Sequence, residues 1–340
     1  MSKRNSSLHR LLSALAIVAI LALCMAAGIA GYWYLGPYRG FGAESFVEIQ
    51  RGMSSRAIAR ELASHGVVRS PWSFLAVRLL HPTATLQAGE YRFGSAVTPW
   101  QAFQKIRRGE IFYEDFSVPE GNNIFDIAGL LKGLDTVKPT PFLDAVERAD
   151  MIRDLDPSAP NLEGYLFPST YRVTHKTTAR QLCGIMTAEF RRQWLLAGGV
   201  SNSPDIHQTV TVASLVEKET SIAEERPLVA AVFLNRLRLN MPLQCDPTTV
   251  YAALLENRYR GVIHKSDLAS ENAYNTYAHV GLPPGPIANP GAESLKAALH
   301  PAQTDYLYFV AKADGSETHH FSAELSEHEK AVLAYRKSAR

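Results

Sequence analysis

Residues 210–220 read Val-Thr-Val-Ala-Ser-Leu-Val-Glu-Lys-Glu-Thr, an apolar run that ends in two carboxylates, Glu217 and Glu219. Its spacing predicts a helix with one face in a core. A carboxyl group on the partly apolar side of such a helix loses hydration, so its pKa rises and it can serve as a general acid. A helical wheel places Glu219 somewhat closer to the centre of the apolar arc, so periodicity does not choose between the two. A solvated glutamate at the helix edge is the common alternative.

The segments around this run predict a helix-rich domain followed by a short return of β-structure. Apolar residues at three and four spacing predict helices over 181–196, 204–220 and 224–239. Farther on, we expect a buried strand over 306–310, a turn through Asp314-Gly315, a partner strand near 319–322 and a last helix over 323–335.

The first part of the chain contains a weak internal repeat, called the echo below, whose two copies are 69 residues apart. Each copy reads as a β-like run, a turn glycine and a helix that packs back onto the strand. The matched positions are Ile49, Gly52, Ile58, Ala59 and Leu62 with Val118, Gly121, Ile127, Ala128 and Leu131. The spacing resembles the start of the LysM module, a small fold that binds N-acetylated glycans. Between the copies we expect a helix over 71–80, a strand over 89–93 and a helix over 99–108.

The N-terminal segment predicts a membrane anchor. Residues 11–30 contain no charged side chain, and a run of about 20 apolar residues is long enough to cross a bilayer. Lys3, Arg4 and Arg10 precede it, and positive charge on the short side keeps that end in the cytoplasm. We therefore expect a cytoplasmic tail over 1–10 and a transmembrane helix over 11–35. A signal peptide cleaved near 28–30 fits less well, because cleaved apolar cores run about 7 to 15 residues.

The composition is that of a folded protein of about two domains. The chain has 340 residues, of which 46% are hydrophobic and 20% charged, with a net charge of +2, so nothing indicates a nucleic-acid partner. Outside the membrane segment only Cys183 and Cys245 remain to pair, and nothing in the sequence shows that they meet, so the favoured interpretation is two small buried residues. No CxxC or HExxH spacing occurs. We predict no metal and no cofactor.

Four segments carry more polar and turn-forming residues than packing requires. Taken singly, each could be loop chemistry. Together they offer amides, hydroxyls, carboxylates and aromatic faces, the set with which a carbohydrate groove binds sugar hydroxyls and rings. The segments are 162–168, 243–248, 273–277 and 281–287.

With the Val-Glu-Lys-Glu motif at 216–219, these segments resemble the membrane-anchored endolytic murein transglycosylases, the YceG-like family. The resemblance covers nearly the whole chain. It implies an α+β fold with three parts: the N-terminal transmembrane helix, a small LysM-like α+β module over 44–112, and a larger helix-rich α+β catalytic domain over 113–340. The catalytic acid of the family falls on Glu217. Cys245 stands where the family pattern has Thr, and Pro286 is a second departure.

The resemblance also implies a lyase reaction. Glu217 would protonate the glycosidic oxygen between MurNAc and GlcNAc and then accept the proton of the C6 hydroxyl that closes a 1,6-anhydro ring. The positions expected to bind substrate or to support the acid are Glu163, Glu219, Gln244, Asp246, Asn275, Thr276 and Tyr277.

The implied setting is the cell wall. Peptidoglycan strands are the expected substrate and peptidoglycan synthases the expected partners. The protein would lie in the bacterial inner membrane with its catalytic domain outside the cytoplasm, and its cuts would help to end glycan elongation. The alternative function is a membrane-tethered scaffold that binds peptidoglycan without cleaving it.

Overall fold

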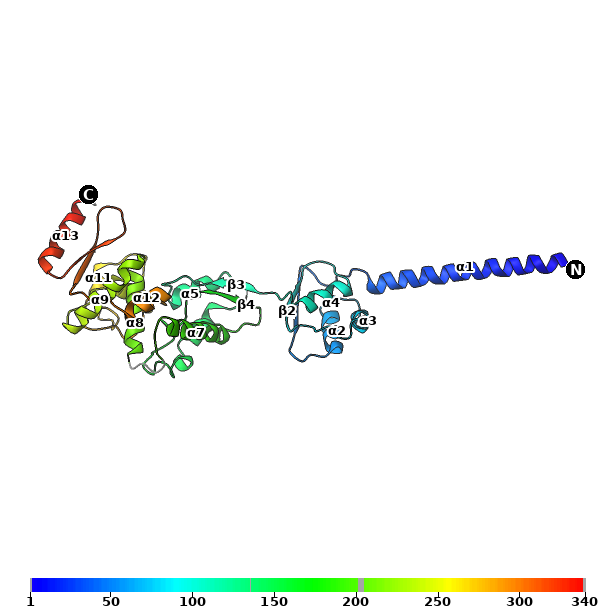
Figure 1. Ribbon diagram of the computed structural model, residues 1–340, viewed down its shortest axis with the longest axis horizontal. Coiled ribbons are helices and arrows are strands. Elements are labelled where there is room, and N and C mark those ends of the chain that lie inside the picture. The colour runs from blue at the N-terminus through cyan, green and yellow to red at the C-terminus, as the bar shows by residue number, and fades with distance from the viewer. Residues whose placement is uncertain (1, 135, 201–204, 339–340) are drawn as a thin grey trace. The chain divides into compact units, whose positions relative to one another are not determined.

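The chain divides into two compact units, residues 1–114 and 115–340 (Figure 1). This computed structural model describes residues 2–134, 136–200 and 205–338, and leaves out the side chains of residues 2–14, 30 and 33. Each unit has a hydrophobic core of its own.

The first unit begins with a long helix, α1 (Ser2–Leu35). Among the helices whose side chains are described, none is both long and apolar enough to cross a membrane. The side chains of the expected cytoplasmic tail, residues 1–10, and of the first part of the expected span, residues 11–14, lie outside the described ones.

The rest of the first unit is a two-stranded antiparallel sheet with three helices. The sheet pairs Val47 with Tyr91, and both side chains are fully buried. Helix α3 begins where expected because the Ser70 side chain accepts the amide proton of Trp72 and Pro71 occupies the first turn. The expected helices over 71–80 and 99–108 and the strand over 89–93 are confirmed. The elements are β1 (Ser45–Ile49), α2 (Ser55–Ser64), α3 (Pro71–Leu80), β2 (Gly89–Phe93) and α4 (Pro99–Arg108). The likeness of this unit to LysM stays a prediction.

The internal echo corresponds to a repeated local structure. In each copy the chain leaves a strand, turns at a glycine with φ near +75° and enters a helix whose matched apolar residues are buried. Gly52 has φ +79° and Gly121 has φ +74°, a left-handed conformation that favours glycine. The caps that follow are Ser54 and Asn123. The second copy matters for function because its glycine lies in the candidate site.

The second unit begins with a core that is built from a short two-stranded sheet and from the helices that lie between and after its strands in the chain. Strand β3 pairs with β4, and the aromatic rings of Phe142, Tyr165, Phe190 and Trp194 fill the space beneath. The elements are β3 (Glu114–Ser117), α5 (Ile124–Leu131), α6 (Pro139–Val146), the 3-10 turn Ala149–Met151, β4 (Thr170–Val173) and α7 (Ala179–Leu196).

Helix α8 (Ile206–Glu219) is the central element of the second unit. Val210 and Ala213 belong to the first core, whereas Val212, Leu215 and Val216 belong to a second core formed with α9 (Arg226–Arg238). A helix that is apolar on all sides is a buried one. The helix is thus more deeply enclosed than the one-sided pattern predicted, and its last turn brings Glu217 to the edge of two cores. Residue 204, where the predicted helix begins, lies outside the described residues.

The remaining elements complete the second core and the C-terminal region. The helix expected over 224–239 is a 3-10 turn, Ala223–Glu225, followed directly by α9. Helix α12 packs against both α8 and α9 (Figure 1). The elements are α10 (Asp246–Leu255), α11 (Lys265–Leu268), α12 (Ala292–Leu299), β5 (Tyr308–Ala311), β6 (His319–Ser322) and α13 (Leu325–Ser338).

The hairpin β5–β6 departs from the sequence prediction in one respect. The turn and the partner strand are where expected, but the strand begins at Tyr308, and all four of its residues are half-buried, so the prediction of a buried strand is wrong. A two-stranded hairpin has no further strands beside it, so its residues are buried only where a helix covers them. Here α13, which contains no buried residue, leaves a pocket of about 720 Å³ between itself and the hairpin.

Candidate active site

Glu217 lies in the last turn of α8, and its side chain is only 6% exposed. Two groups contact its carboxylate. The amide N–H of Gly291, the N-cap of α12, donates to Oε2 at 2.9 Å, and the guanidinium of Arg226 at the start of α9 lies 3.6 Å from Oε1. The chain therefore supplies one backbone donor and one buried cation to a nearly enclosed carboxyl group.

The loop before α5 packs directly on this glutamate. A Cβ added at Gly121 would lie 3.4 Å from Cγ of Glu217, and Lys218 Nζ donates to the Gly121 carbonyl at 3.1 Å. The left-handed φ favours glycine at position 121, and the 3.4 Å distance shows that the loop lies in van der Waals contact with Glu217. The loop thus fixes one side of the Glu217 pocket.

Asn289 joins the loops that surround the glutamate. Its side chain is fully buried: Oδ1 accepts the N–H of Leu166 at 2.9 Å, and Nδ2 donates to the Asn122 carbonyl and to Glu163 Oε1, both at 2.9 Å. Its backbone also pairs with Gly121 and Asn122. This one residue holds the segment after the Pro-Pro turn, the loop before α5 and the 162–168 segment together.

Glu163, expected as a supporting group, is 1% exposed and lies behind this network. It accepts the N–H of Ile124 at 2.9 Å at the start of α5, in addition to the bond from Asn289. Burial raises the pKa of Glu163 to about 8, so the group is largely protonated at neutral pH. Glu163 therefore supports the loop that carries Gly121 and makes no hydrogen bond or ion pair with Glu217.

Glu219 faces the other side of the helix end. Cys245 Sγ donates to Glu219 Oε1 at 3.0 Å, and burial, reinforced by Asp246, raises the pKa of Glu219. Cys183 and Cys245 are both buried, as expected, and both are free thiols, which answers the question of pairing that the sequence left open. The structure thus separates the two glutamates that the helical wheel left unresolved.

The remaining expected residues form one cluster near Glu219. Thr276 accepts the N–H of Cys245 at 3.0 Å, and the Gln244 N–H donates to the Thr276 carbonyl at 3.2 Å. The Tyr277 hydroxyl donates to Asp246 Oδ1 at 2.5 Å. Gln244 and Asp246 are exposed and Tyr277 is half-buried. These three side chains are therefore available to a ligand.

Asn275 and Thr276 are placed differently from their neighbours in the cluster. Both are buried, and the Asn275 amide is used on backbone carbonyls, with the shortest bond to Ser270 at 2.6 Å. Because neither side chain reaches the surface, direct sugar contact does not fit them. The structure gives them a supporting position for the Gln244–Asp246 segment.

A second carboxyl group, Glu120, lies near Glu217. A Cβ added at Gly291 would lie only 2.1 Å from Glu120 Oε1, so the two residues pack tightly. Because N and Cβ of one residue are about 2.5 Å apart, the facing oxygens of Glu120 and Glu217 lie within about 7.5 Å of each other. Partial burial and the Glu217 charge raise the pKa of Glu120.

His207 fastens the Pro-Pro turn to the start of α8. Its Nδ1 lies 2.7 Å from Asp156 Oδ2 and its Nε2 lies 3.0 Å from the Pro284 carbonyl. Both partners accept, so both ring nitrogens donate and the imidazole is protonated. The bond to Asp156 raises the pKa of His207, and, against the effect of burial, His207 and Tyr165 lower the pKa of Asp156.

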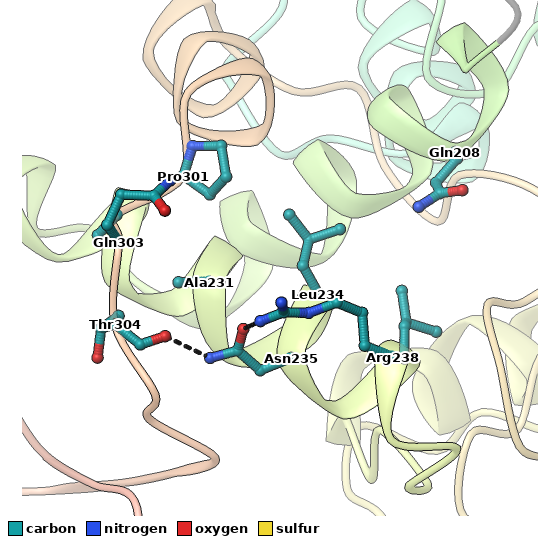
Figure 2. A pocket seen from close by; sticks show the side chains of 10 residues that line it. Gln208, Ala231, Leu234, Asn235, Arg238, Pro301, Gln303 and Thr304 are labelled. Atoms are coloured by element: carbon teal, nitrogen blue, oxygen red, sulfur yellow. Dashed lines mark hydrogen bonds between the residues drawn. The ribbon is translucent and has the colours of Figure 1, made fainter.

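A pocket of about 610 Å³ between the start of α8, α9 and residues 301–304 lies apart from these groups (Figure 2). Gln208 borders it nine residues before Glu217 on the same helix, about 13 Å along the axis and on the opposite face. In Figure 2, Asn235 and Arg238 are joined to each other, and Asn235 also donates to the Thr304 carbonyl. We assign this pocket no role in the Glu217 site.

The sequence interpretation missed the residues that surround Glu217. They are Glu120, Arg226, Asn289 and Gly291, and Gly121 was noticed only as part of the echo. Asn289 and Gly291 directly follow the 281–287 segment, which was the one available signal.

The fold and the site define an α+β protein in which one nearly enclosed glutamate at the end of a central helix, Glu217, is held by a helix N-cap and an arginine. The sequence profile of the YceG-like family matches residues 47–334, and the chain belongs to this family.

Relatives support the same assignment. The chain is 32% identical to an endolytic murein transglycosylase of Bacillus subtilis strain 168, over 85% of this chain and 84% of the relative. It is 29% identical to an endolytic murein transglycosylase of Streptococcus pneumoniae strain R6, over 87% of this chain but 60% of the relative. A crystal structure of a YceG-like protein from Listeria monocytogenes matches with a TM-score of 0.52 and 31% identity, over 84% of this chain and 98% of that chain.

Proposed function

We propose that the protein is an endolytic murein transglycosylase that cuts the MurNAc–GlcNAc bond inside peptidoglycan strands. The observation that carries the proposal is the placement of Glu217, a nearly enclosed carboxyl group that touches the Gly291 amide and Arg226. The names of the Bacillus and Streptococcus relatives support the same reaction.

The reaction needs one carboxyl group to act twice. Glu217 gives its proton to the glycosidic oxygen as the C1–O bond breaks. The C6 hydroxyl of the same MurNAc then bonds to C1 and returns its proton to Glu217, so a 1,6-anhydro end forms and no water is consumed. The Gly291 N–H and Arg226 stabilise the carboxylate that exists between the two transfers.

We assign substrate contacts to the exposed groups of the cluster near Glu219. Gln244, Asp246 and Tyr277 offer an amide, a carboxylate and a phenol on one edge. Such groups bind sugar hydroxyls and stack on sugar rings. Four residues support these contacts from behind. The 243–248 segment and its neighbours are held by Glu219, Asn275 and Thr276, and the loop before α5 is held by Glu163.

Hydrolysis is a second candidate reaction, and Glu120 is the observation that favours it. Enzymes that hydrolyse glycosides place their two carboxyl groups about 5 to 5.5 Å apart when they retain configuration and about 6.5 to 9.5 Å apart when they invert it. The limit of about 7.5 Å between Glu120 and Glu217 is compatible with both arrangements. In that case Glu120 would orient a water molecule, and reducing ends would form.

The setting of the reaction forms part of the proposal. We assign residues 11–35 the role of a membrane anchor, because residues 11–30 carry no charge. With Lys3, Arg4 and Arg10 on the cytoplasmic side, we propose that the second unit acts outside the cytoplasm and that its partners are peptidoglycan synthases. Membrane flotation of the full chain and of a chain that starts at residue 36 tests the anchor: equal flotation of both would contradict it.

Purified peptidoglycan incubated with the protein separates an enzyme from a scaffold. Glu217→Gln removes the acid while keeping the size of the side chain, and Glu224→Gln, an exposed glutamate before α9, is the matched control. We expect cleavage by the parent and the control but not by Glu217→Gln, with binding to peptidoglycan retained in all three. Binding without cleavage in the parent would support the scaffold instead.

A further inference from the structure

The exposed face of helix α3 in the first unit is apolar. Trp72 is 73% exposed, Leu79 79% and Leu80 77%. Trp72 and Leu79 lie seven residues apart, or about 20° on the helical wheel, so they share one face. Phe74 and Val77 on the opposite face already fill the core. The exposed side chains are therefore not needed for folding.

The surface continues beyond α3. Helix α3 packs against α2 and α4. At the end of α3 the His81 ring contacts the ring of Trp100, which lies at the start of α4, with 4.9 Å between the ring centroids and a tilt of 33°. Trp100 is 39% exposed. We call Trp72, Leu79, Leu80 and Trp100 the α3 surface.

The part of the chain that carries this surface is basic. Residues 36–113 contain ten Lys or Arg and five Asp or Glu, whereas α3 has no acidic residue. The neighbouring helices carry exposed arginines at positions 56 and 60 on α2 and 107 and 108 on α4. A basic region beside exposed Trp and Leu matches the chemistry of an anionic lipid surface.

The chain also holds this unit close to the proposed anchor. Helix α1 ends at Leu35, and the backbone of Tyr38 already pairs with Val97. Three residues span at most about 10 Å. If residues 11–35 cross the bilayer, the unit cannot leave its surface.

We infer that the α3 surface docks on the outer face of the anionic bilayer in which the chain is anchored. Trp72 and the two leucines enter the interface between headgroups and acyl chains, where tryptophan is favoured. A glycan is a poorer occupant, since the exposed residues of α3 are Trp72, Ala76, Leu79 and Leu80, which offer one indole N–H as a hydrogen-bonding group. The inference rests on the proposed anchoring. Docking would fix the height of the first unit above the membrane.

Quenching by brominated lipids tests the docking on the full chain. The chain is reconstituted into vesicles of phosphatidylglycerol and phosphatidylcholine whose acyl chains carry bromine near the headgroup. Subtracting the emission of Trp72→Phe from that of the parent isolates Trp72. We expect bromine to reduce this difference about twofold, and less so when phosphatidylglycerol is replaced by neutral lipid.

Two double variants give the comparison. Leu79→Glu with Leu80→Glu should abolish the quenching of Trp72, whereas Leu195→Glu with Leu196→Glu should leave it unchanged, because those exposed leucines lie at the end of α7 in the second unit. Flotation of the chain without quenching of Trp72 would overturn docking and leave anchoring intact. Failure to float would overturn both. A response of Trp72 to soluble glycan but not to bromine would replace the lipid by a sugar.

Discussion

Changing Asn289 to Ala tests whether the loops around Glu217 depend on a single buried amide. The variant leaves the Leu166 N–H and Glu163 Oε1 without their partner, while the Asn122 carbonyl keeps the backbone N–H of residue 289 at 3.0 Å. An unsatisfied buried group costs about 1 to 3 kcal/mol. The pKa of about 8 keeps Glu163 mainly neutral at pH 7, so neither group left unsatisfied carries a charge. We therefore expect the Leu166 N–H and Glu163 Oε1 each to cost an amount in the lower half of that range. The free energy of unfolding should fall by about 3 kcal/mol.

Urea unfolding of residues 36–340, with Trp72 and Trp100 changed to Phe so that the emission comes from Trp194, measures this loss. Trp194 is 1% exposed in the first core of the second unit, so its emission reports on that unit. Asn235→Ala is the matched control, since Asn235 is buried and donates two bonds, to Thr304 and Tyr306, far from Glu217.

Activity distinguishes the two variants. Both should lose stability, but only Asn289→Ala should lose peptidoglycan cleavage while folded, by about tenfold or more, because the loop that carries Gly121 is then no longer joined to Leu166 and Glu163 through the amide. A loss of stability under about 1 kcal/mol with normal activity in Asn289→Ala would refute the reasoning.

Three further predictions concern neighbouring groups. Gly291→Ala should displace the flexible Glu120 carboxylate, because the new Cβ would lie 2.1 Å from it, and should lower stability by about 0.5 to 1 kcal/mol, because alanine is a poorer N-cap than glycine. Product analysis should then show whether Glu120 matters, and an unchanged rate and product would remove it from the mechanism. The ion pair between His207 and Asp156 stabilises the fold fully between pH 3.8 and pH 6.5, the pKa values of Asp156 and His207 in the unfolded chain. This stability is lost as the pH rises through the raised pKa of His207 or falls through the lowered pKa of Asp156. Between pH 6.5 and 9 the melting temperature of the parent should therefore fall more than that of His207→Gln, and parallel profiles would contradict the pairing. Cys245→Thr should keep stability within about 1 kcal/mol in urea unfolding, since a hydroxyl can also donate to Glu219, and a larger loss would show that the thiol is required.

Local chemistry made part of the fold predictable. Ser70 with Pro71, and Thr98 with Gln101, mark helix starts through bonds within three residues, and α3 and α4 begin where these caps place them. The glycine of the echo likewise marks a left-handed turn at both positions. The half-buried state of β5 was not predictable, because it depends on how closely α13 packs.

The site was predictable only where a motif carried it. Glu217 follows from the Val-Glu-Lys-Glu motif, but Gly291 reaches it from 74 residues away, and no local pattern records that contact. Asn275 shows the opposite error. An amide in a polar loop looks the same in sequence whether it faces a ligand or, as here, the backbone of its own loop.

The most direct test of the central claim is the mass of the new ends formed from peptidoglycan in water enriched in heavy oxygen. We expect 1,6-anhydro ends without heavy oxygen from the parent, and none from Glu217→Gln. Reducing ends that contain heavy oxygen would contradict the account and make Glu120 the second carboxyl group of a hydrolase.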